Sequence, residues 1–382
     1  MKAIINGTLV FPDRITDGIV LIEGDRIVAS GNVNIPAGAE IIDATGLYVG
    51  PGFVDQHSHG YQHCGESIPV KVDPQAASMA HLNHGVTTYI PSTDYSDTLE
   101  EHEKVIQLCV ETLNSGVDTP IMGIHLEGPY INRLFGSNSL GAMDYDDDVC
   151  EKLFAMASPY VRHCTYAPEL PTAPRLEEKM RKYGITGAIG HTNAGPADVE
   201  RAVAYGARIA THLYDATGCD RSFEDAAKLT QHPQNCTANI LLSIPGMYYE
   251  LICDSAQMHT TKYSVCEALR AGGEDYVVLI SDAFVETAEQ KEENDVNFDV
   301  TGCLSGSRLC LPEAIRNFIK FTGVDMKAAF KCAATNSAKA LGLFDTVGSI
   351  DAGKLANVVL VDPSFHVKKV FFKGQEVTEI RD

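Results

Sequence analysis

The sequence lacks the features that would place a protein in a membrane, on nucleic acid or on the secretory route. No run of about 18 apolar residues occurs, so we expect no membrane span. Lysine and arginine form no cluster, and a formal net charge of −21 should repel nucleic acid and anionic membranes. Residues 1–7 have no apolar segment before a small-residue cleavage site. They therefore predict a strand rather than a signal peptide.

Several common site signatures are also missing. The 11 cysteines are scattered without a C-x-x-C pair, which argues against a disulfide framework and against a zinc ribbon. We expect reduced thiols and hence a cytoplasmic protein. The sequence contains neither a Gly-x-Ser-x-Gly arrangement nor a complete Gly-x-x-x-x-Gly-Lys-Ser/Thr phosphate loop. Neither of these site types therefore competes with the one developed below.

The two ends of the chain resemble each other and differ from the middle. Residues 1–50 alternate short β-rich runs with turns, and Gly24-Asp25 between two apolar runs is typical of a hairpin. The last forty residues repeat this style in the runs 356–361 and 367–372. We expect residues 1–50 and 345–382 to pair into one small β-domain, a β-sandwich.

The middle of the chain alternates apolar runs with amphipathic helical segments, which is typical of a parallel sheet. Eight strands are expected, at residues 53–55, 87–90, 121–124, 163–166, 186–189, 207–210, 251–253 and 276–280. A helix is expected at 196–204, with Pro196 at its start and Gly206 after its end. This pattern predicts an α/β fold with a (β/α)8 TIM-like barrel over residues 51–344.

Residue types that bind metals follow five of the expected strands. They are His57 and His59 after the first strand, Glu127 after the third, His191 after the fifth, His212 after the sixth and Asp282 after the eighth. The carboxyl ends of barrel strands converge on one mouth, so these side chains would share a site. A single histidine after a strand is usually a hydrogen-bonded loop or core residue, but five strands that end this way predict a metal centre. Imidazole and carboxylate suit zinc and other first-row divalent ions.

Asp282 has a distinct role available in such a centre. A divalent ion lowers the pKa of a bound water roughly to 7, which generates a nucleophile at neutral pH. A nearby carboxylate can take the proton from that water and later give it to a leaving amine. We therefore predict that Asp282 is the catalytic residue of a metal-dependent hydrolase.

Motifs spread over nearly the whole chain carry a resemblance to known enzymes. Residues 51–60, PGFVDQHSHG, resemble the opening motif of the amidohydrolase superfamily. More narrowly, the chain resembles the N-acetylglucosamine-6-phosphate deacetylase family. The motifs for this second resemblance are residues 123–132 (GIHLEGPYIN), 167–169 (APE), 190–194 (GHTNA), 211–214 (THLY), 281–283 (SDA), 301–307 (TGCLSGS) and 348–357 (GSIDAGKLAN).

The resemblance implies a role for each candidate ligand. Glu127, His191 and His212 would hold a principal ion. His57 and His59, with Glu127 bridging, could hold a second. Some relatives have lost the His-x-His pair and use one metal, whereas this chain keeps it.

The resemblance also implies how the rest of the enzyme is built. Asp282 would serve as general base and general acid, and Leu304 would line the pocket for the acyl methyl group. The implied fold is the barrel with its small β-domain, and the implied assembly is a homodimer.

The chain departs from the family at positions expected to contact substrate. Asp215 and Ala216 stand where the family has Asn-Ala, and Gln257 and Met143 stand where it has histidine. The family's Arg-Glu-Pro-Gly stretch, which is tied to phosphate binding, is missing, and Arg221 is a possible substitute. These five positions, with Leu304, are the candidate substrate contacts.

Together these features predict an enzyme that needs one or two divalent ions, zinc first, and removes an acyl group from a small amide. An N-acetylated amino sugar is the first candidate substrate. The alternatives are another N-acyl compound, such as an N-acyl amino acid or an unphosphorylated sugar, and a barrel that has lost catalysis. The departures favour poor use of N-acetylglucosamine 6-phosphate.

Overall fold

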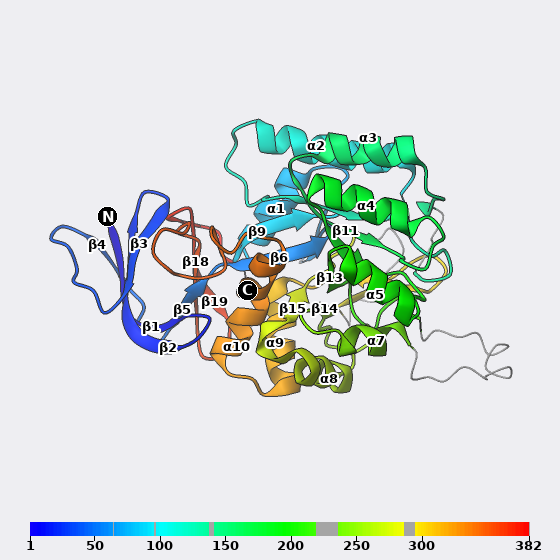
Figure 1. Ribbon diagram of the computed structural model, residues 1–382. Coiled ribbons are helices and arrows are strands. Elements are labelled where there is room, and N and C mark those ends of the chain that lie inside the picture. Colours follow the sequence, from blue (N-terminus) through cyan, green and yellow to red (C-terminus); the bar gives the residue numbers. More distant parts are fainter. Residues whose placement is uncertain (64, 95–96, 137–140, 219–235, 286–294, 382) are drawn as a thin grey trace.

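Both chain ends contribute to one eight-stranded sheet, which lies to one side of the molecule (Figure 1). The computed structural model describes residues 1–63, 65–94, 97–136, 141–218, 236–285 and 295–381. The strands of this sheet are β1 (Lys2–Val10), β2 (Ile15–Glu23), β3 (Arg26–Gly31), β4 (Glu40–Asp43), β5 (Tyr48–Pro51), β18 (Val358–Val361), β19 (Val367–Phe372) and β20 (Gln375–Glu376). Strand β5 pairs antiparallel with β18, so that Val49 lies opposite Leu360. The two ends of the chain therefore meet through these two strands.

Apolar side chains of both ends form a core on this sheet. Ile4, Val20, Val49, Val358 and Leu360 belong to one cluster and are fully buried. The predicted hairpin is confirmed, because β2 and β3 pair antiparallel around a turn in which Gly24 has a φ of +59°. That left-handed backbone is one that glycine adopts without strain.

The middle of the chain forms parallel strands. Six make one sheet in the order β10-β11-β12-β13-β14-β15, and β6 pairs in parallel with β9. Their bounds are β6 (Phe53–Ser58), β9 (Val86–Pro91), β10 (Ile124–Glu127), β11 (Val161–Tyr166), β12 (Thr186–Ile189), β13 (Ala207–Ala210), β14 (Tyr248–Ile252) and β15 (Val277–Ile280). Parallel bridges from Tyr89 to Ile121 and from Ser92 to His125 connect β9 with the segment of β10. All four residues of β15 are fully buried, as expected for strands covered on both faces.

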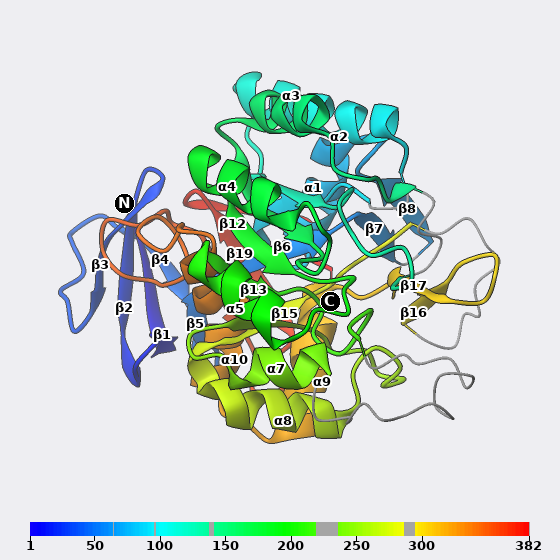
Figure 2. The same cartoon turned by 45° about the vertical axis from the view of Figure 1, so that its right-hand side comes forward.

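Helices lie around the outside of these strands (Figures 1 and 2). They are α1 (Pro74–Leu82), α2 (Leu99–Asn114), α3 (Asp147–Ala157), α4 (Ala173–Tyr183), α5 (Pro196–Ala204), α7 (Thr237–Ser243), α8 (Lys262–Gly272), α9 (Leu311–Thr322), α10 (Met326–Phe330) and α11 (Asn336–Ala340), with the short turns η3 (Gly273–Asp275) and η4 (Lys331–Thr335). The helix predicted at 196–204 is confirmed with the same bounds.

Two hairpins lie on the side of the parallel strands away from the chain-end sheet (Figure 2). They pair β7 (Gly60–His63) with β8 (Glu66–Pro69), and β16 (Val296–Phe298) with β17 (Leu304–Ser307). Ser307 forms a parallel bridge with Ala283, just beyond β15. The second hairpin therefore lies against the end of the strand that leads to Asp282.

Six of the eight strands have bounds that differ from those predicted, by up to three residues, and two of these differences bear on the site. The strand expected at 121–124 is observed as β10, three residues later, and β6 continues through His57 to Ser58. The prediction ended both strands where polar residues begin. The main-chain pairing continues because the polar side chains at these positions are buried within the site instead of facing water.

Among the described residues, no helix is both long and apolar enough to cross a membrane. Eight of the described cysteines are free thiols. Cys236 is disulfide-bonded, which departs from the expectation that all cysteines are reduced.

Candidate metal centre and active site

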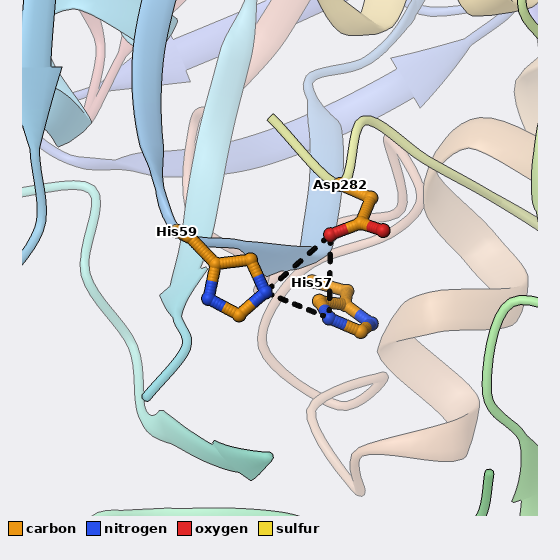
Figure 3. Close-up of side chains that lie close together, drawn as sticks. All are labelled: His57, His59 and Asp282. Carbon is orange, nitrogen blue, oxygen red and sulfur yellow. Dashed lines mark hydrogen bonds and ion pairs between the residues drawn. The ribbon is translucent and has the colours of Figure 1, made fainter. Parts of the chain in front are cut away.

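Six predicted site residues come together at the carboxyl ends of five parallel strands. His57 lies in β6, His59 directly follows it, and Glu127 is the last residue of β10. His191, His212 and Asp282 each lie two residues beyond the ends of β12, β13 and β15. All six are buried, with relative exposures between 0% and 8%. Figure 3 shows how His57, His59 and Asp282 point toward one another. The convergence expected from the barrel prediction is therefore observed for all six.

Glu127 stands between two groups of these side chains. Its Oε1 lies 2.9 Å from His191 Nε2 and 3.1 Å from His212 Nε2. Its Oε2 lies 3.0 Å from His59 Nε2 and 3.5 Å from His57 Nε2. We call Glu127, His191 and His212 the principal half, and His57, His59 and Asp282 the second half.

The second half is equally compact. Asp282 Oδ1 lies 3.4 Å from His59 Nε2 and 3.6 Å from His57 Nε2, and the two Nε2 atoms are 3.3 Å apart (Figure 3). Within each half, one ligand-type atom from every residue lies within 4.8 Å of the others. Each half could thus place three donor atoms around a single ion.

The backbone at three strand ends is left-handed. The φ angles are +48° at His191, +27° at His212 and +45° at Asp282. Residues other than glycine rarely adopt this region, and it persists only where the surrounding structure imposes it. The turn brings each side chain from the strand end into the shared site.

Opposite charges hold the cluster together. Burial disfavours the charged form of His59, but the neighbouring carboxylates of Asp282 and Glu127 outweigh it and raise the pKa of His59 to about 10. The same competition raises the pKa of His57 and His212. Burial would raise the pKa of Glu127 and Asp282, but the nearby imidazoles hold both pKa values well below the usual range. Both carboxylates are therefore charged at neutral pH.

The donor set fits a divalent cation. Glu127 Oε2 is buried and makes no hydrogen bond of acceptable geometry, although His59 Nε2 is 3.0 Å away. His191 Nε2 and His212 Nε2 approach to 3.1 Å, a distance at which two imidazole lone pairs repel unless a proton or a cation lies between them. Imidazole nitrogen with carboxylate oxygen is a donor set that zinc and similar ions accept.

Comparison with known proteins identifies the family. The amidohydrolase family matches residues 48–377, which is most of the chain. The chain belongs to the amidohydrolase family. It is accordingly an enzyme that hydrolyses carbon–nitrogen bonds, and families of this kind depend on metal ions.

Individual relatives of this amidohydrolase are distant but span its length. It is 26% identical to the N-acetylglucosamine-6-phosphate deacetylase of Bos taurus over 97% of this chain and 95% of the relative. It is 28% identical to the enzyme of that name from Homo sapiens, over 88% of this chain and 84% of the relative. The crystal structure of N-acetylglucosamine-6-phosphate deacetylase from Pasteurella multocida has the same fold, with a TM-score of 0.85 at 20% identity, covering 98% of this chain and 99% of that chain.

Two of the candidate substrate contacts lie beside the principal half. Asp215 accepts at 2.7 Å from His259 Nδ1, and the Asp215 main-chain oxygen lies 3.2 Å from His212 Nδ1. His259 Nε2 lies 3.0 Å from the Gly306 carbonyl oxygen. Ala216 has a φ of +48° and its carbonyl oxygen accepts from Thr192 N. The segment 215–216 is thus fixed next to the site.

The other candidate contacts that the structure describes have different surroundings. Gln257 Oε1 accepts from Lys262 N at 2.9 Å, at the start of α8, so its carboxamide oxygen is used to cap a helix. Met143 packs against the main apolar core. Leu304 is half-buried at the start of β17, the strand that reaches Asp282. Arg221 lies outside the described residues.

Four polar residues around the site were not predicted from the sequence. Glu250, Gln56 and His163 are fully buried, and His259 is nearly so. Gln56 Nε2 donates to Glu250 Oε1 at 2.6 Å, and Glu250 Oε2 lies 3.3 Å from His57 Nδ1. A signal was present for Glu250, which is the one charged residue in the run 247–253, MYYELIC. A charged residue inside a buried parallel strand needs a partner.

Proposed function

We propose that this amidohydrolase removes the N-acetyl group of an amino sugar, releasing acetate and the free amine. The observation that carries the proposal is the Glu127 carboxylate between two groups of buried ligand atoms, with Asp282 at their edge. The names of the curated relatives support an N-acetylhexosamine as substrate.

One or two divalent ions per chain are proposed as the cofactor, with zinc as the first candidate. Glu127, His191 and His212 would hold the principal ion. His57 and His59, with Glu127 shared, would hold the second. When bound, such an ion polarises the amide carbonyl and makes water nucleophilic near neutral pH.

Asp282 is proposed as the proton carrier of the reaction. Its carboxylate would accept a proton from the attacking water as the new C–O bond forms, and would donate it to the sugar nitrogen as the C–N bond breaks. Two features hold the residue in place. Asp282 N donates to the His57 carbonyl oxygen at 3.0 Å, and Ser307 N donates to the Asp282 carbonyl oxygen at 2.8 Å.

The architecture that we propose is a closed (β/α)8 barrel over residues 51–344, with a small β-domain, a β-sandwich, from 1–50 and 345–382. Hydrogen bonds from Asp282 N to His57 O and from His59 N to Ala283 O support closure between β15 and β6. A homodimer and a cytoplasmic location remain predictions, the first from the family resemblance and the second from the cysteine pattern.

Acetate release tests the proposed function directly. Protein loaded with Zn²⁺ should release acetate from N-acetylglucosamine or its 6-phosphate, and chelation should abolish the release. A loaded, folded protein that deacetylates no amino sugar but hydrolyses an N-acyl amino acid would redirect the assignment to that substrate class. No hydrolysis of any N-acyl compound would favour the non-catalytic barrel.

A second candidate substrate is an N-acyl compound without a phosphate. The observation that favours it is the Asp215–His259 pair beside the principal half, which puts a carboxylate where related enzymes have a neutral amide. His259 offsets part of the charge of this carboxylate, and the part that remains would disfavour an anionic group on the substrate.

A further inference from the structure

Glu250 is a buried carboxylate that lies behind the metal centre rather than in it. It occupies the middle of β14, and its relative exposure is 0%. Removing a carboxylate from water costs several kcal/mol unless its oxygens are satisfied. The partners that satisfy Glu250 therefore indicate what the residue does.

Each oxygen of Glu250 has a defined set of partners. Oε1 accepts from Gln56 Nε2 at 2.6 Å. Oε2 lies 3.3 Å from His57 Nδ1 and accepts from the His212 main-chain N–H, also at 3.3 Å. One carboxylate thus contacts a ligand-type residue from each half of the site.

The contact with His57 fixes which ring nitrogen carries the proton. A carboxylate only accepts hydrogen bonds, so the nitrogen facing it must be N–H. Without a cation, the carboxylates that face the ring favour a second proton on it. Once a cation takes the place of that proton, His57 keeps its hydrogen on Nδ1 and offers the lone pair of Nε2. That atom points to Glu127 Oε2 at 3.5 Å and Asp282 Oδ1 at 3.6 Å, where an ion would bind.

The other ring-nitrogen contacts in the site are of a weaker kind. His191 Nδ1 and His212 Nδ1 each face a main-chain carbonyl oxygen, from Phe135 and Asp215. A carboxylate partner makes an imidazole ligand more basic than a carbonyl does, because it carries a full charge. Among these three rings, His57 alone has that partner.

We propose that Glu250 is a positioning residue, which holds His57 in its Nδ1–H form and thereby sets the affinity of the second half for its ion. The inference rests on the proposed function in assuming that a divalent ion binds at this centre. It predicts that the ion of the second half depends on Glu250 and that the ion of the principal half does not.

The test is Glu250→Gln, which keeps the shape of the side chain and removes its charge. Zinc bound per chain is measured by elemental analysis after dialysis against chelator-buffered Zn²⁺ over a range of free concentrations. Loss of an outer partner typically costs about 10–100-fold in metal affinity. We expect that loss for the second ion only. The visible spectrum of the Co²⁺-substituted protein should lose the contribution of the second ion at matched free Co²⁺.

Glu177→Gln is the matched control. Glu177 on α4 is also fully buried and hydrogen-bonded, to Tyr166 and Arg201, but it is not a neighbour of the candidate ligands. It should leave both ions in place. Thermal unfolding of both variants shows that each is folded. If Glu250→Gln does not fold, Gln56→Leu, which removes the donor to Oε1, should weaken the second ion in the same direction.

Three results would overturn the inference. Equal zinc affinity in wild type and Glu250→Gln refutes it and leaves the proposed function intact. An equal loss of affinity for both ions refutes a role that is selective for His57. A wild-type protein that binds no divalent ion refutes the proposed function and this inference with it.

Discussion

The two halves of the metal centre are anchored by different kinds of partner. In the principal half, the outer nitrogens of His191 and His212 lie 2.9 Å and 3.2 Å from main-chain carbonyl oxygens. In the second half, His57 meets the Glu250 carboxylate, and His59 Nδ1 has no hydrogen-bond partner in the part of the chain that the structure describes.

The difference indicates how robust each half is. Every residue type has a main-chain carbonyl, so a substitution that preserves the fold does not remove the hydrogen-bond acceptors of the principal half. The second half depends on side chains, which single substitutions remove. We therefore expect the principal half to tolerate single substitutions of its outer partners better than the second half does.

The largest effect is expected from His191→Ala and His212→Ala. An open catalytic site has only about three protein ligands, so removing one should strip the principal ion. Activity should fall to that of the chelated protein. Elemental analysis checks the ion content, with His366→Ala as control because His366 lies far along the chain in the chain-end region and is partly exposed. Unchanged metal in both variants would remove the basis for the proposed site.

Asp282→Asn should have the next largest effect, and it separates chemistry from metal binding. Asparagine keeps the shape but cannot accept the proton, and loss of general acid–base catalysis typically costs about 10²–10⁴-fold. We expect that loss in kcat while the principal ion is retained. Steady-state kinetics and metal analysis on the same preparation test this. A nearly normal kcat would assign the proton transfer to another group.

His57→Ala and His59→Ala sharpen the comparison within the second half. Both should release the second ion, and the affinity loss should exceed the roughly 10–100-fold typical of an outer partner. They should differ in stability, because only His57→Ala leaves Glu250 buried without its imidazole. Breaking a buried pair costs about 3–5 kcal/mol. Chemical denaturation should therefore show the larger loss for His57→Ala, and equal losses would contradict the anchoring role of Glu250.

The sequence alone predicted which side chains would converge, because residues of the same chemical type recur at the ends of the expected strands. His57, Glu127, His191, His212 and Asp282 were each predicted from their position after an apolar run, and the structure brings them together. Strand bounds were less predictable. The prediction ended β10 before His125 because hydropathy changes there, whereas main-chain pairing continues through buried polar residues.

Contacts between distant strands could not be predicted from the local pattern. Glu250 is 193 residues from His57 along the chain, and nothing near either residue indicates the pairing. Gln257 was expected to face the substrate, but its carboxamide oxygen caps α8. His259 lies two residues further on and its ring reaches Asp215 instead. Tertiary packing decides which residue of this loop faces the site, and the hydrophobic periodicity of the sequence carries no information about it.

A smaller effect is expected from pH on the Asp215–His259 pair. Burial opposes the charge on His259, but Asp215 outweighs it and raises the pKa of His259 to about 9. A raised folded-state pKa stabilises the protein fully below pH 6.5, and this stability is lost as pH rises to about 9. A full conversion of the pKa shift at about 1.4 kcal/mol per unit would overstate the change in unfolding free energy, because Asp215 is 29% exposed and solvent screens the pair. We therefore expect a smaller loss, of about 2 kcal/mol. Denaturation at pH 6 and 9.5 should show this loss in wild type and not in His259→Gln.

The smallest effect, and the one that bears on substrate, concerns Asp215 itself. A phosphate dianion is usually bound by arginine or lysine, and the arginine-bearing stretch of related enzymes is missing here. The Asp215 main-chain oxygen lies 3.2 Å from His212 Nδ1 and holds the residue beside the site, and the side-chain carboxylate adds a negative charge that His259 offsets in part. We therefore expect kcat/KM for N-acetylglucosamine to equal or exceed that for its 6-phosphate. Asp215→Asn should shift the ratio about tenfold toward the phosphorylated sugar, which corresponds to about 1.4 kcal/mol. Asp144→Asn is the control, since it removes one negative charge from a fully exposed side chain. A hundredfold wild-type preference for the phosphorylated sugar would contradict the expectation and assign the phosphate to groups outside the described residues, of which Arg221 is the first to test.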